Sequence, residues 1–159
     1  MTDHSSTGLL PGEAEFLQAA IAAAIKGRSE GGIPIGAAPV HEGAVLGTGY
    51  NKRVQLGSPT RHGETDCLEN IGRLPASVYA ASTMITTLSP CDTCTGAMLL
   101  YKIPRVIIGE NRTFVGSEDL LRARGVQVVV VDDQACVEMM TDFIAAEPGL
   151  WNEDIGVVD

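Results

Sequence analysis

Two short segments of this chain carry the residue types of a metal-dependent hydrolytic site. The first is His62-Gly63-Glu64, and the second is Pro90-Cys91-Asp92-Thr93-Cys94. Together they supply one imidazole, two thiols and one carboxylate. Imidazole and thiolate are common ligands of zinc, and a catalytic zinc ion takes three protein ligands and keeps its fourth position for water. The segments therefore predict one Zn²⁺ ion per chain, with His62, Cys91 and Cys94 as the metal ligands.

Both segments lie where helices are expected to begin. Thr60 and Ser89 are suitable N-cap residues, and Pro90 suits a first helical position. In that arrangement Cys91 lies in a first helical turn, where the positive end of the helix favours thiolate over thiol. The second cysteine, three residues further on, shares the same face of the helix. We therefore expect two helix N-termini to face one ion.

Glu64 is two residues from the predicted histidine ligand, so one backbone segment would hold both the ligand and an acid. A carboxylate beside an activated water is able to take a proton and to return it to the substrate. The order H-x-E followed by P-C-x-x-C is typical of zinc-dependent deaminases of nucleobases. We therefore predict that Glu64 is the catalytic proton carrier of a hydrolytic deaminase.

Other interpretations of the same residues remain open at this point. The C-x-x-C segment could form a redox pair, a disulfide or part of a structural zinc site, and His62 could be a core histidine. A site with four cysteines would need Cys67 and Cys136, which lack matching spacing. A redox dithiol would leave the His-x-Glu segment unexplained. We interpret Cys67 and Cys136 as buried apolar residues.

The composition indicates a soluble globular protein with a single domain over residues 1–159. Of these 159 residues, 45% are hydrophobic and 19% are charged. The net charge of −9, without a cluster of basic residues, disfavours a nucleic-acid partner and favours a small-molecule substrate. The apolar runs are too short or too interrupted to span a bilayer, and the first residues do not resemble a secretory signal. We therefore expect no membrane partner and a cytoplasmic location.

Alternation of strand and helix patterns predicts an α/β fold with a three-layer α/β/α sandwich and a mixed central sheet. Glu42-Gly43 predicts a hairpin turn between the first two strands. Residues 1–11 are expected to be loosely ordered, and residues 148–159 to form a C-terminal tail. The predicted helices cover residues 13–26, 60–71, 89–101, 118–124 and 133–146, and the predicted strands cover residues 35–41, 44–50, 79–87, 105–109 and 126–131.

Beyond these motifs, most of the chain after the first predicted helix resembles the fungal-type cytosine deaminases of the cytidine deaminase-like superfamily. The matching stretches include Gly-Glu-Asn at 109–111, the valine-rich segment 128–133, and Trp151 followed by Glu-Asp-Ile-Gly at 153–156. The resemblance implies the cytidine deaminase-like fold, one Zn²⁺ ion, and a homodimer that converts cytosine to uracil and ammonia in pyrimidine salvage.

The resemblance also implies which residues contact the base. A nucleoside carries its sugar on the ring nitrogen that an aspartate would read, so we expect free bases to be preferred over nucleosides. From the residues alone, Asn51 could equally be a turn residue and Asp154 a solvated acid. Trp151 could equally anchor the tail, and Phe114 could be ordinary core packing. The implied substrate-binding residues are Asn51 and Gly63 as donors to the carbonyl oxygen, Asp154 as acceptor for the ring N–H, Ser89 as backbone acceptor for the amino group, and Phe114 and Trp151 as covers of the ring.

Several residues near the predicted site depart from the family pattern. Arg61 stands where an apolar residue is expected, Val54 where a larger aromatic residue is expected, and Thr93 also differs. A smaller Val54 and a charged Arg61 could admit another aminated heterocycle, such as guanine or a creatinine-like ring. Two further alternatives are a non-catalytic zinc-stabilised module and a thiol redox protein. The physiological base is therefore open at this stage.

Overall fold

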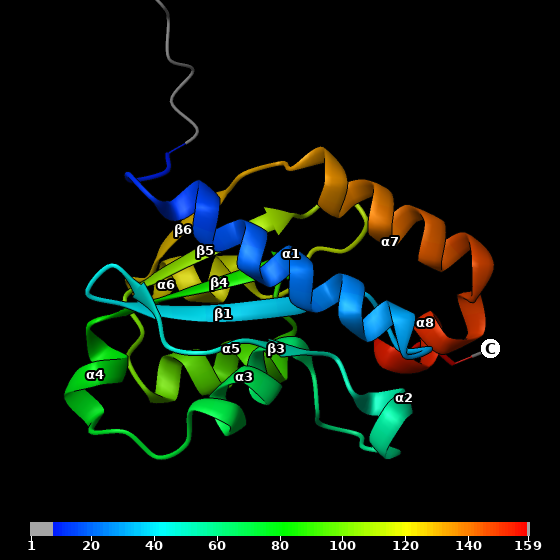
Figure 1. The fold of residues 1–159 in the computed structure, drawn as a ribbon, viewed down its shortest axis with the longest axis horizontal. Helices are drawn as coiled ribbons and strands as arrows, with labels where there is room; N and C mark the ends of the chain where they lie inside the picture. The colour runs from blue at the N-terminus through cyan, green and yellow to red at the C-terminus, as the bar shows by residue number, and fades with distance from the viewer. Residues whose placement is uncertain (1–7, 159) are drawn as a thin grey trace, which may run out of the picture.

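A computed structural model describes residues 8–158, so the part of the expected loose N-terminus at 1–7 lies outside the described residues. Within 8–158 the chain forms one mixed sheet of six strands between helical layers (Figure 1), and the predicted α/β class is confirmed. The strands are β1 (Gly36–His41), β2 (Ala44–Val45), β3 (Gly49–Tyr50), β4 (Ser82–Leu88), β5 (Arg105–Glu110) and β6 (Gln127–Val130). The helices are α1 (Glu13–Ser29), α2 (Arg53–Leu56), α3 (Gly63–Ile71), α4 (Ala76–Ala80), α5 (Asp92–Leu100), α6 (Glu118–Ala123), α7 (Gln134–Ala146) and α8 (Pro148–Asp154).

The sheet has the strand order β2-β1-β4-β5-β6, and β3 pairs with the other end of β1. β1 is antiparallel to β4, whereas β4, β5 and β6 run parallel. Because side chains alternate along a strand, residues in register across neighbouring strands share a face of the sheet. One such apolar row crosses four strands at Ala38, Ile85, Ile107 and Val129.

The two faces of the sheet pack against different helices. On β5, Ile107 faces α1 and α7, whereas the residues on either side of it, Val106 and Ile108, face α3, α4, α5 and α6. Figure 1 shows α1 and α7 on one side of the sheet and α3 and α5 on the other. Each large apolar side chain buried in these layers stabilises the fold by about 1.5–3 kcal/mol. The sheet is therefore covered on both faces, which leaves the strand ends as places for a site.

The first hairpin forms as predicted, but its second strand is interrupted. Glu42 and Gly43 both have positive φ angles, 50° and 72°, which is the backbone of a type I′ turn. The predicted strand at 44–50 forms only the short pieces β2 and β3. Between them Leu46 donates a hydrogen bond to the carbonyl of Pro39 at 2.9 Å, but Pro39 has no N–H to return one. The ladder therefore breaks opposite the proline.

Further boundaries differ from the predictions. The first helix, predicted for residues 13–26, continues to Ser29. The strand predicted from residue 79 begins at Ser82, because Tyr79 belongs to α4 and its hydroxyl donates to the carbonyl of Gly72 at 2.6 Å. The predicted C-terminal tail is wrong for residues 148–154, which form α8. Pro148 occupies the first turn of α8, where its missing N–H costs nothing, and Trp151 is buried.

An ion pair fastens the start of α1 to the start of β5. The guanidinium of Arg105 donates two hydrogen bonds to the carboxylate of Glu13, at 2.6 and 2.9 Å, and one to the carbonyl of Gly8 at 3.0 Å. Both charged side chains are buried. A bidentate pair of this kind fixes geometry as well as energy. It sets where α1 lies across the sheet.

Candidate metal centre and active site

The predicted metal residues meet beyond the carboxyl end of β4. β4 ends at Leu88, and three residues later Cys91 is the N-cap of α5. His62 is the N-cap of α3. Cys94 lies in the first turn of α5 and is fully buried. The central parallel strands and two helix starts thus position all three side chains.

Both helices begin later than predicted, so Thr60 and Ser89 are not their N-caps. At α3, the hydroxyl of Thr65 accepts a hydrogen bond from the backbone N–H of His62 at 2.9 Å and donates to the carbonyl of Thr60 at 2.7 Å. At α5, the carbonyl of Cys91 accepts the first helical bond, from Thr95, at 2.9 Å. These bonds place one metal-binding side chain at each N-cap rather than inside a first turn.

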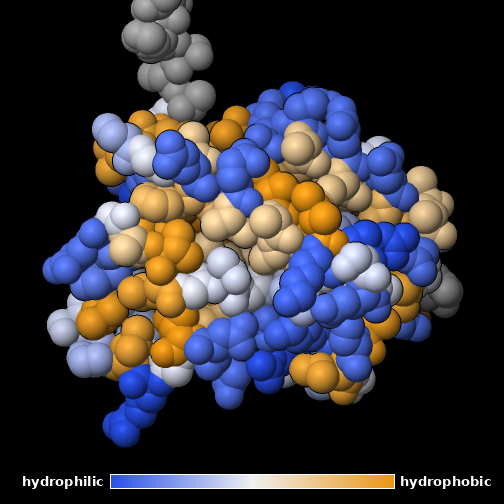
Figure 2. Space-filling model, viewed as in Figure 1, coloured by the Kyte–Doolittle hydropathy of each residue, from blue (hydrophilic) through white to orange (hydrophobic). Residues whose placement is uncertain are grey.

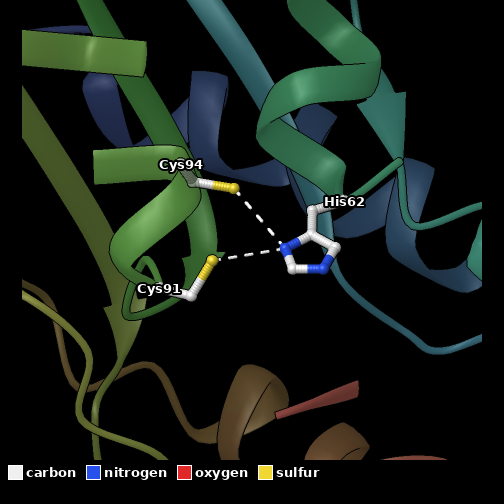
Figure 3. A group of neighbouring side chains, drawn as sticks. All are labelled: His62, Cys91 and Cys94. Carbon is white, nitrogen blue, oxygen red and sulfur yellow. Dashed lines mark hydrogen bonds between the residues drawn. The ribbon is translucent and has the colours of Figure 1, made fainter. Parts of the chain in front are cut away.

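The three side chains have the spacing of ligands around one ion (Figure 3). Nδ1 of His62 lies 3.3 Å from Sγ of Cys91 and 3.6 Å from Sγ of Cys94, and all three atoms lie within 4.8 Å of one another. Tetrahedral zinc with bonds of about 2.05 Å to nitrogen and 2.3 Å to sulfur separates these atoms by about 3.6 Å. The donor set and its geometry therefore fit one Zn²⁺ ion, as predicted.

The electrostatics of the thiol pair also suit a divalent cation. The pKa of Cys91 is lowered to about 4, because Cys94 and His62 hydrogen-bond its thiolate. The pKa of Cys94 is raised, because its thiol donates to that thiolate and because the site is buried. The hydrogen bond with Cys91 raises the pKa of His62. The three residues alone therefore hold one thiolate, and a dication would favour the second.

Glu64 occupies a buried position beside the metal residues. Only 4% of the residue is exposed, and burial raises the pKa of its carboxyl group. Oε1 of Glu64 lies 2.6 Å from the hydroxyl oxygen of Thr86, which in turn lies 3.1 Å from the carbonyl oxygen of Leu88. When Glu64 is ionised, Thr86 can donate to it. When Glu64 is protonated, it can donate to Thr86, and Thr86 then donates to Leu88. Both protonation states of Glu64 are therefore hydrogen-bonded.

A small cavity lies between these residues and α8. The rings of Phe114 and Trp151 meet edge to face in its wall, with centroids 5.8 Å apart and an interplanar angle of 89°. Four of the six predicted substrate contacts, Ser89, Phe114, Trp151 and Asp154, line the cavity, whereas Asn51 and Gly63 are not among its lining residues. The lining residues are Ile35, His62, Glu64, Leu88, Ser89, Cys91, Phe114, Trp151, Asp154 and Ile155.

Asn51 does not line the cavity, but it contacts Asp154, which does. It is fully buried, and its Nδ2 donates a hydrogen bond to Oδ1 of Asp154 at 3.3 Å. Its own Oδ1 accepts the backbone N–H of Arg53 at 3.0 Å, which is a turn contact. Asn51 is therefore a turn residue and also lies beside the site. Arg53 was not predicted as a site residue. It pairs with Asp154, and a carboxylate packed into the fold requires a nearby cation.

The loop that carries Phe114 is fastened to the segment before Cys91. The hydroxyl of Ser89 donates to the buried carboxylate of Glu118 at 2.6 Å and accepts the N–H of Gly116 at 2.9 Å. A Cβ atom at Gly116 would lie 1.8 Å from the carbonyl oxygen of Pro90, so only glycine permits this approach. Sequence reasoning missed Glu118. These bonds engage the hydroxyl of Ser89 as both donor and acceptor.

The departures from the family pattern at positions 54 and 61 lie outside the cavity. Nε of Arg61 donates to the buried Oδ1 of Asp66 at 2.8 Å, and Nζ of Lys52 pairs with the other carboxylate oxygen at 3.1 Å. Val54 is exposed on α2. Neither Arg61 nor Val54 lines the cavity, so neither changes its shape directly.

Residues 12–110 match the family described as the cytidine and deoxycytidylate deaminase zinc-binding region. The matched range contains all three metal residues and Glu64. Fold and site together thus define a zinc-binding deaminase. The chain belongs to this family.

Comparison with individual proteins narrows the resemblance. The chain is 52% identical to cytosine deaminase of Candida albicans (strain SC5314 / ATCC MYA-2876) over 141 residues, which cover 88% of this chain and 94% of that protein. It is 32% identical to a tRNA-specific adenosine deaminase of Streptococcus pyogenes serotype M18 over 107 residues, 66% of this chain and 67% of that protein. The predicted resemblance to cytosine deaminases is confirmed.

The fold is shared with more distant solved structures. A structure of guanine deaminase from Nitrosomonas europaea has a TM-score of 0.63 at 18% identity, covering 91% of this chain and 98% of that chain. At this identity the likeness supports the three-layer fold and says nothing about the substrate of this chain.

Proposed function

We propose that this protein is a zinc-dependent aminohydrolase that converts the free base cytosine to uracil and ammonia. The observation that carries the proposal is the placement of Glu64, buried and backed by Thr86, in the same cavity wall as His62 and Cys91. A metal centre and a proton carrier that share one enclosed space are what hydrolytic deamination requires. The 52% identity to the Candida albicans cytosine deaminase supports cytosine as the base.

The chain supplies the proton transfers of this reaction. Bound zinc would lower the pKa of a coordinated water and so provide a nucleophile near neutral pH. Glu64 takes a proton from the attacking water and delivers it to the ring nitrogen beside the amino-bearing carbon. It then transfers the second proton to the amino group, which leaves as ammonia. One carboxylate suffices, because each proton that it takes is returned within the cycle.

The rest of the cavity would orient the base. A carboxylate that must accept a ring N–H rejects a ring that carries a sugar on that nitrogen, which favours cytosine over cytidine. The proposed contacts are Asp154 with the ring N–H, Ser89 through its carbonyl with the amino group, Asn51 and the Gly63 N–H with the carbonyl oxygen, and Phe114 and Trp151 with the ring faces and edges.

The substitution Glu64→Gln tests the proposed role of Glu64. We expect the rate of ammonia release from cytosine to fall by about 10²–10⁴-fold, because proton transfer by a positioned side chain contributes that much. Bound zinc, measured by metal analysis on the same sample, should stay at one ion per chain. Glu138→Gln is the control, since Glu138 is exposed on α7 and lines neither the cavity nor the groove between α3, α4 and α5, and it should retain activity.

A substrate panel separates the competing functions. Cytosine, cytidine, guanine and creatinine are offered to the same preparation, and ammonia is measured. Turnover of guanine or creatinine but not of cytosine would replace the proposed substrate. One bound zinc with no turnover of any base would favour a non-catalytic zinc module. Equal turnover of cytosine and cytidine would contradict the proposed role of Asp154.

We further propose that two copies form a homodimer. A groove of about 730 Å³ runs between α3, α4 and α5, and Leu100 beside it on α5 is 71% exposed. Glu69 and Arg73 line the same groove, so two copies related by a two-fold axis could pair opposite charges across it. On the face shown in Figure 2, hydrophobic residues form one patch near α4 and another between α1 and α7. Sedimentation of the zinc-loaded protein tests the mass; a monomer at all concentrations would refute the dimer.

The proposed setting is the cytoplasm, with a role in pyrimidine salvage and without nucleic acid as a partner. Reducing conditions would keep Cys91 and Cys94 free of a disulfide and available to a metal. The net charge of −9 would oppose association with phosphate backbones. Among the helices at 8–158, none has the length and apolar character needed to cross a membrane. Imaging of a tagged chain in cells tests the location.

A further inference from the structure

Arg53 connects three segments that meet behind the active-site cavity. Its Nη1 donates to Oδ1 of Asp154 at 2.9 Å, and its Nε donates to the carbonyl of Pro59 at 3.2 Å. Its backbone N–H donates to Oδ1 of Asn51 at 3.0 Å. One residue of the short helix α2 thus contacts α8, the loop before His62 and the residue that follows β3.

The contact with Arg53 gives the buried carboxylate of Asp154 a cationic partner. Only 4% of the Asp154 side chain is exposed, and a buried carboxylate without a cation is strongly destabilised. The nearest ring nitrogen, Nε2 of His62, lies 3.9 Å away, which is too far for a hydrogen bond. The guanidinium of Arg53 therefore supplies a charge-assisted hydrogen bond that fixes one oxygen of Asp154.

The contact with Asn51 determines which way round its side-chain amide lies. Because Oδ1 of Asn51 accepts the N–H of Arg53, its Nδ2 must point away from that backbone, and it bonds Oδ1 of Asp154. An asparagine held in this way can only donate on the side of the cavity. Arg53 therefore sets a donor at Asn51 and an acceptor at Asp154.

We propose that Arg53 is a positioning residue for recognition of the base, which holds Asp154 as an acceptor and Asn51 as a donor. This inference rests on the proposed function and deepens it, because it explains how the cavity would read the N–H and the carbonyl of one ring. Arg53 does not line the cavity and touches no substrate. Its effect passes through the two side chains that it orients.

Binding of cytosine in a catalytically inactive background tests this inference. Each protein carries Glu64→Gln, so that the base is not consumed, and Trp151, the only tryptophan, reports occupancy by its fluorescence. Arg53→Gln removes the guanidinium but keeps the backbone N–H that holds Asn51. It should weaken cytosine binding by about 10- to 100-fold, as expected for loss of the charge-assisted hydrogen bond to Asp154. Arg53→Lys should restore part of the affinity, because it returns the charge but not the bond to Pro59.

Two further readouts separate positioning from a general loss of structure. In a double-mutant cycle, Arg53→Gln should have little further effect once Asp154→Asn is present, because the two act through one contact. The preference for cytosine over 1-methylcytosine, which lacks the ring N–H, should also fall in Arg53→Gln. Arg112→Gln is the matched control, since it removes an exposed Arg112–Asp132 pair elsewhere and should change neither quantity.

The outcomes distinguish this inference from the proposed function. If the Glu64→Gln reference binds cytosine and Arg53→Gln binds it equally well, the inference is overturned and the proposed function stands. An effect of Arg53→Gln that is undiminished in the Asp154→Asn background also overturns it. If the reference binds no cytosine and the unsubstituted protein releases no ammonia from it, both are overturned. Zinc content and thermal unfolding, measured for every variant, exclude metal loss and misfolding as causes.

Discussion

The cavity has two sides that are built differently. The metal corner, His62, Cys91 and Cys94, projects from the N-caps and first turn of two helices that pack directly on the central strands. The side proposed to recognise the base consists of Asn51, Phe114, Trp151 and Asp154, which come from loops and short helices far apart in the chain. Asn51 and Asp154 bond across 103 positions. The difference indicates that local structure positions the metal residues, whereas tertiary contacts position the residues proposed to recognise the base.

Breaking the metal corner should have the largest effect. His62→Ala removes the ligand that faces both sulfurs, so we expect zinc and deamination to fall to background together. The sheet and helical layers do not depend on this side chain, so circular dichroism should remain that of a folded protein. Retention of full zinc content in His62→Ala would show that the ion is held elsewhere.

Removing the metal instead of a ligand should expose the thiols selectively. With zinc bound we expect slow alkylation of all four cysteines. After chelation Cys91 should react first, since it is partly exposed and its pKa is about 4. The thiolate persists above that pKa, so labelling should stay rapid from neutral pH down to about pH 5 and slow as the pH falls through 4. Mass spectrometry of labelled peptides follows the order of reaction.

Opening the base-recognition side should weaken binding without removing zinc. Trp151→Ala deletes a ring that is 95% buried against the cavity and Phe114. We expect kcat/KM for cytosine to fall by about 10- to 100-fold, the usual contribution of an aromatic side chain stacked on a base. Trp151→Phe should recover most of it. An unchanged kcat/KM in Trp151→Ala would mean that α8 does not cover the substrate.

A milder change at the boundary of the two sides concerns Thr86. Thr86→Val keeps the volume but removes the hydroxyl that bonds Glu64 in either protonation state. We expect kcat to fall by about 10-fold, as for one lost hydrogen bond to a charged group, with KM and zinc content unchanged. A change confined to KM would assign Thr86 to binding instead.

The smallest effect on activity should come from the two cysteines outside the metal corner. Cys67 and Cys136 are fully buried in the two layers of the core, and burial raises the pKa of each thiol. Cys67→Ala and Cys136→Ala should each lower the free energy of unfolding by about 1–2 kcal/mol and leave zinc content and turnover essentially unchanged. Loss of zinc in either variant would extend the metal corner beyond its three residues.

Much of the fold could be predicted because its long elements have clear periodicity and turn chemistry. Glu42-Gly43 and the strand-helix alternation gave the correct hairpin and class. The helices α2, α4 and α8 were not predicted, since four to seven residues carry too little periodicity and these helices are stabilised by packing. The start of α3 was misplaced because Thr65 accepts the backbone N–H of His62, which makes His62 rather than Thr60 the N-cap.

For the candidate site, the metal corner could be predicted from the sequence, whereas the other side of the cavity could not be predicted from local patterns. The residues of the metal corner could be proposed from spacing alone, since His-x-Glu and C-x-x-C are local patterns. Asp154 and Trp151 required the family resemblance, because nothing in the local sequence tells a buried acid from a solvated one. Arg53 and Glu118 were missed altogether, since their partners, Asp154 and Ser89, lie 101 and 29 positions away.

The pairing of Glu13 with Arg105 has a practical consequence for shortened versions of the protein. Deleting residues through Glu13 would leave the guanidinium of Arg105 buried without its carboxylate partner. A buried charge that has lost its partner costs about 3–5 kcal/mol, which is a large share of the stability of a small domain. Removal of residues 1–7 alone spares both the carboxylate and the Gly8 carbonyl. Stepwise deletion from the N-terminus should therefore be tolerated as far as residue 7. The melting temperature should then drop abruptly once the deletion includes Glu13.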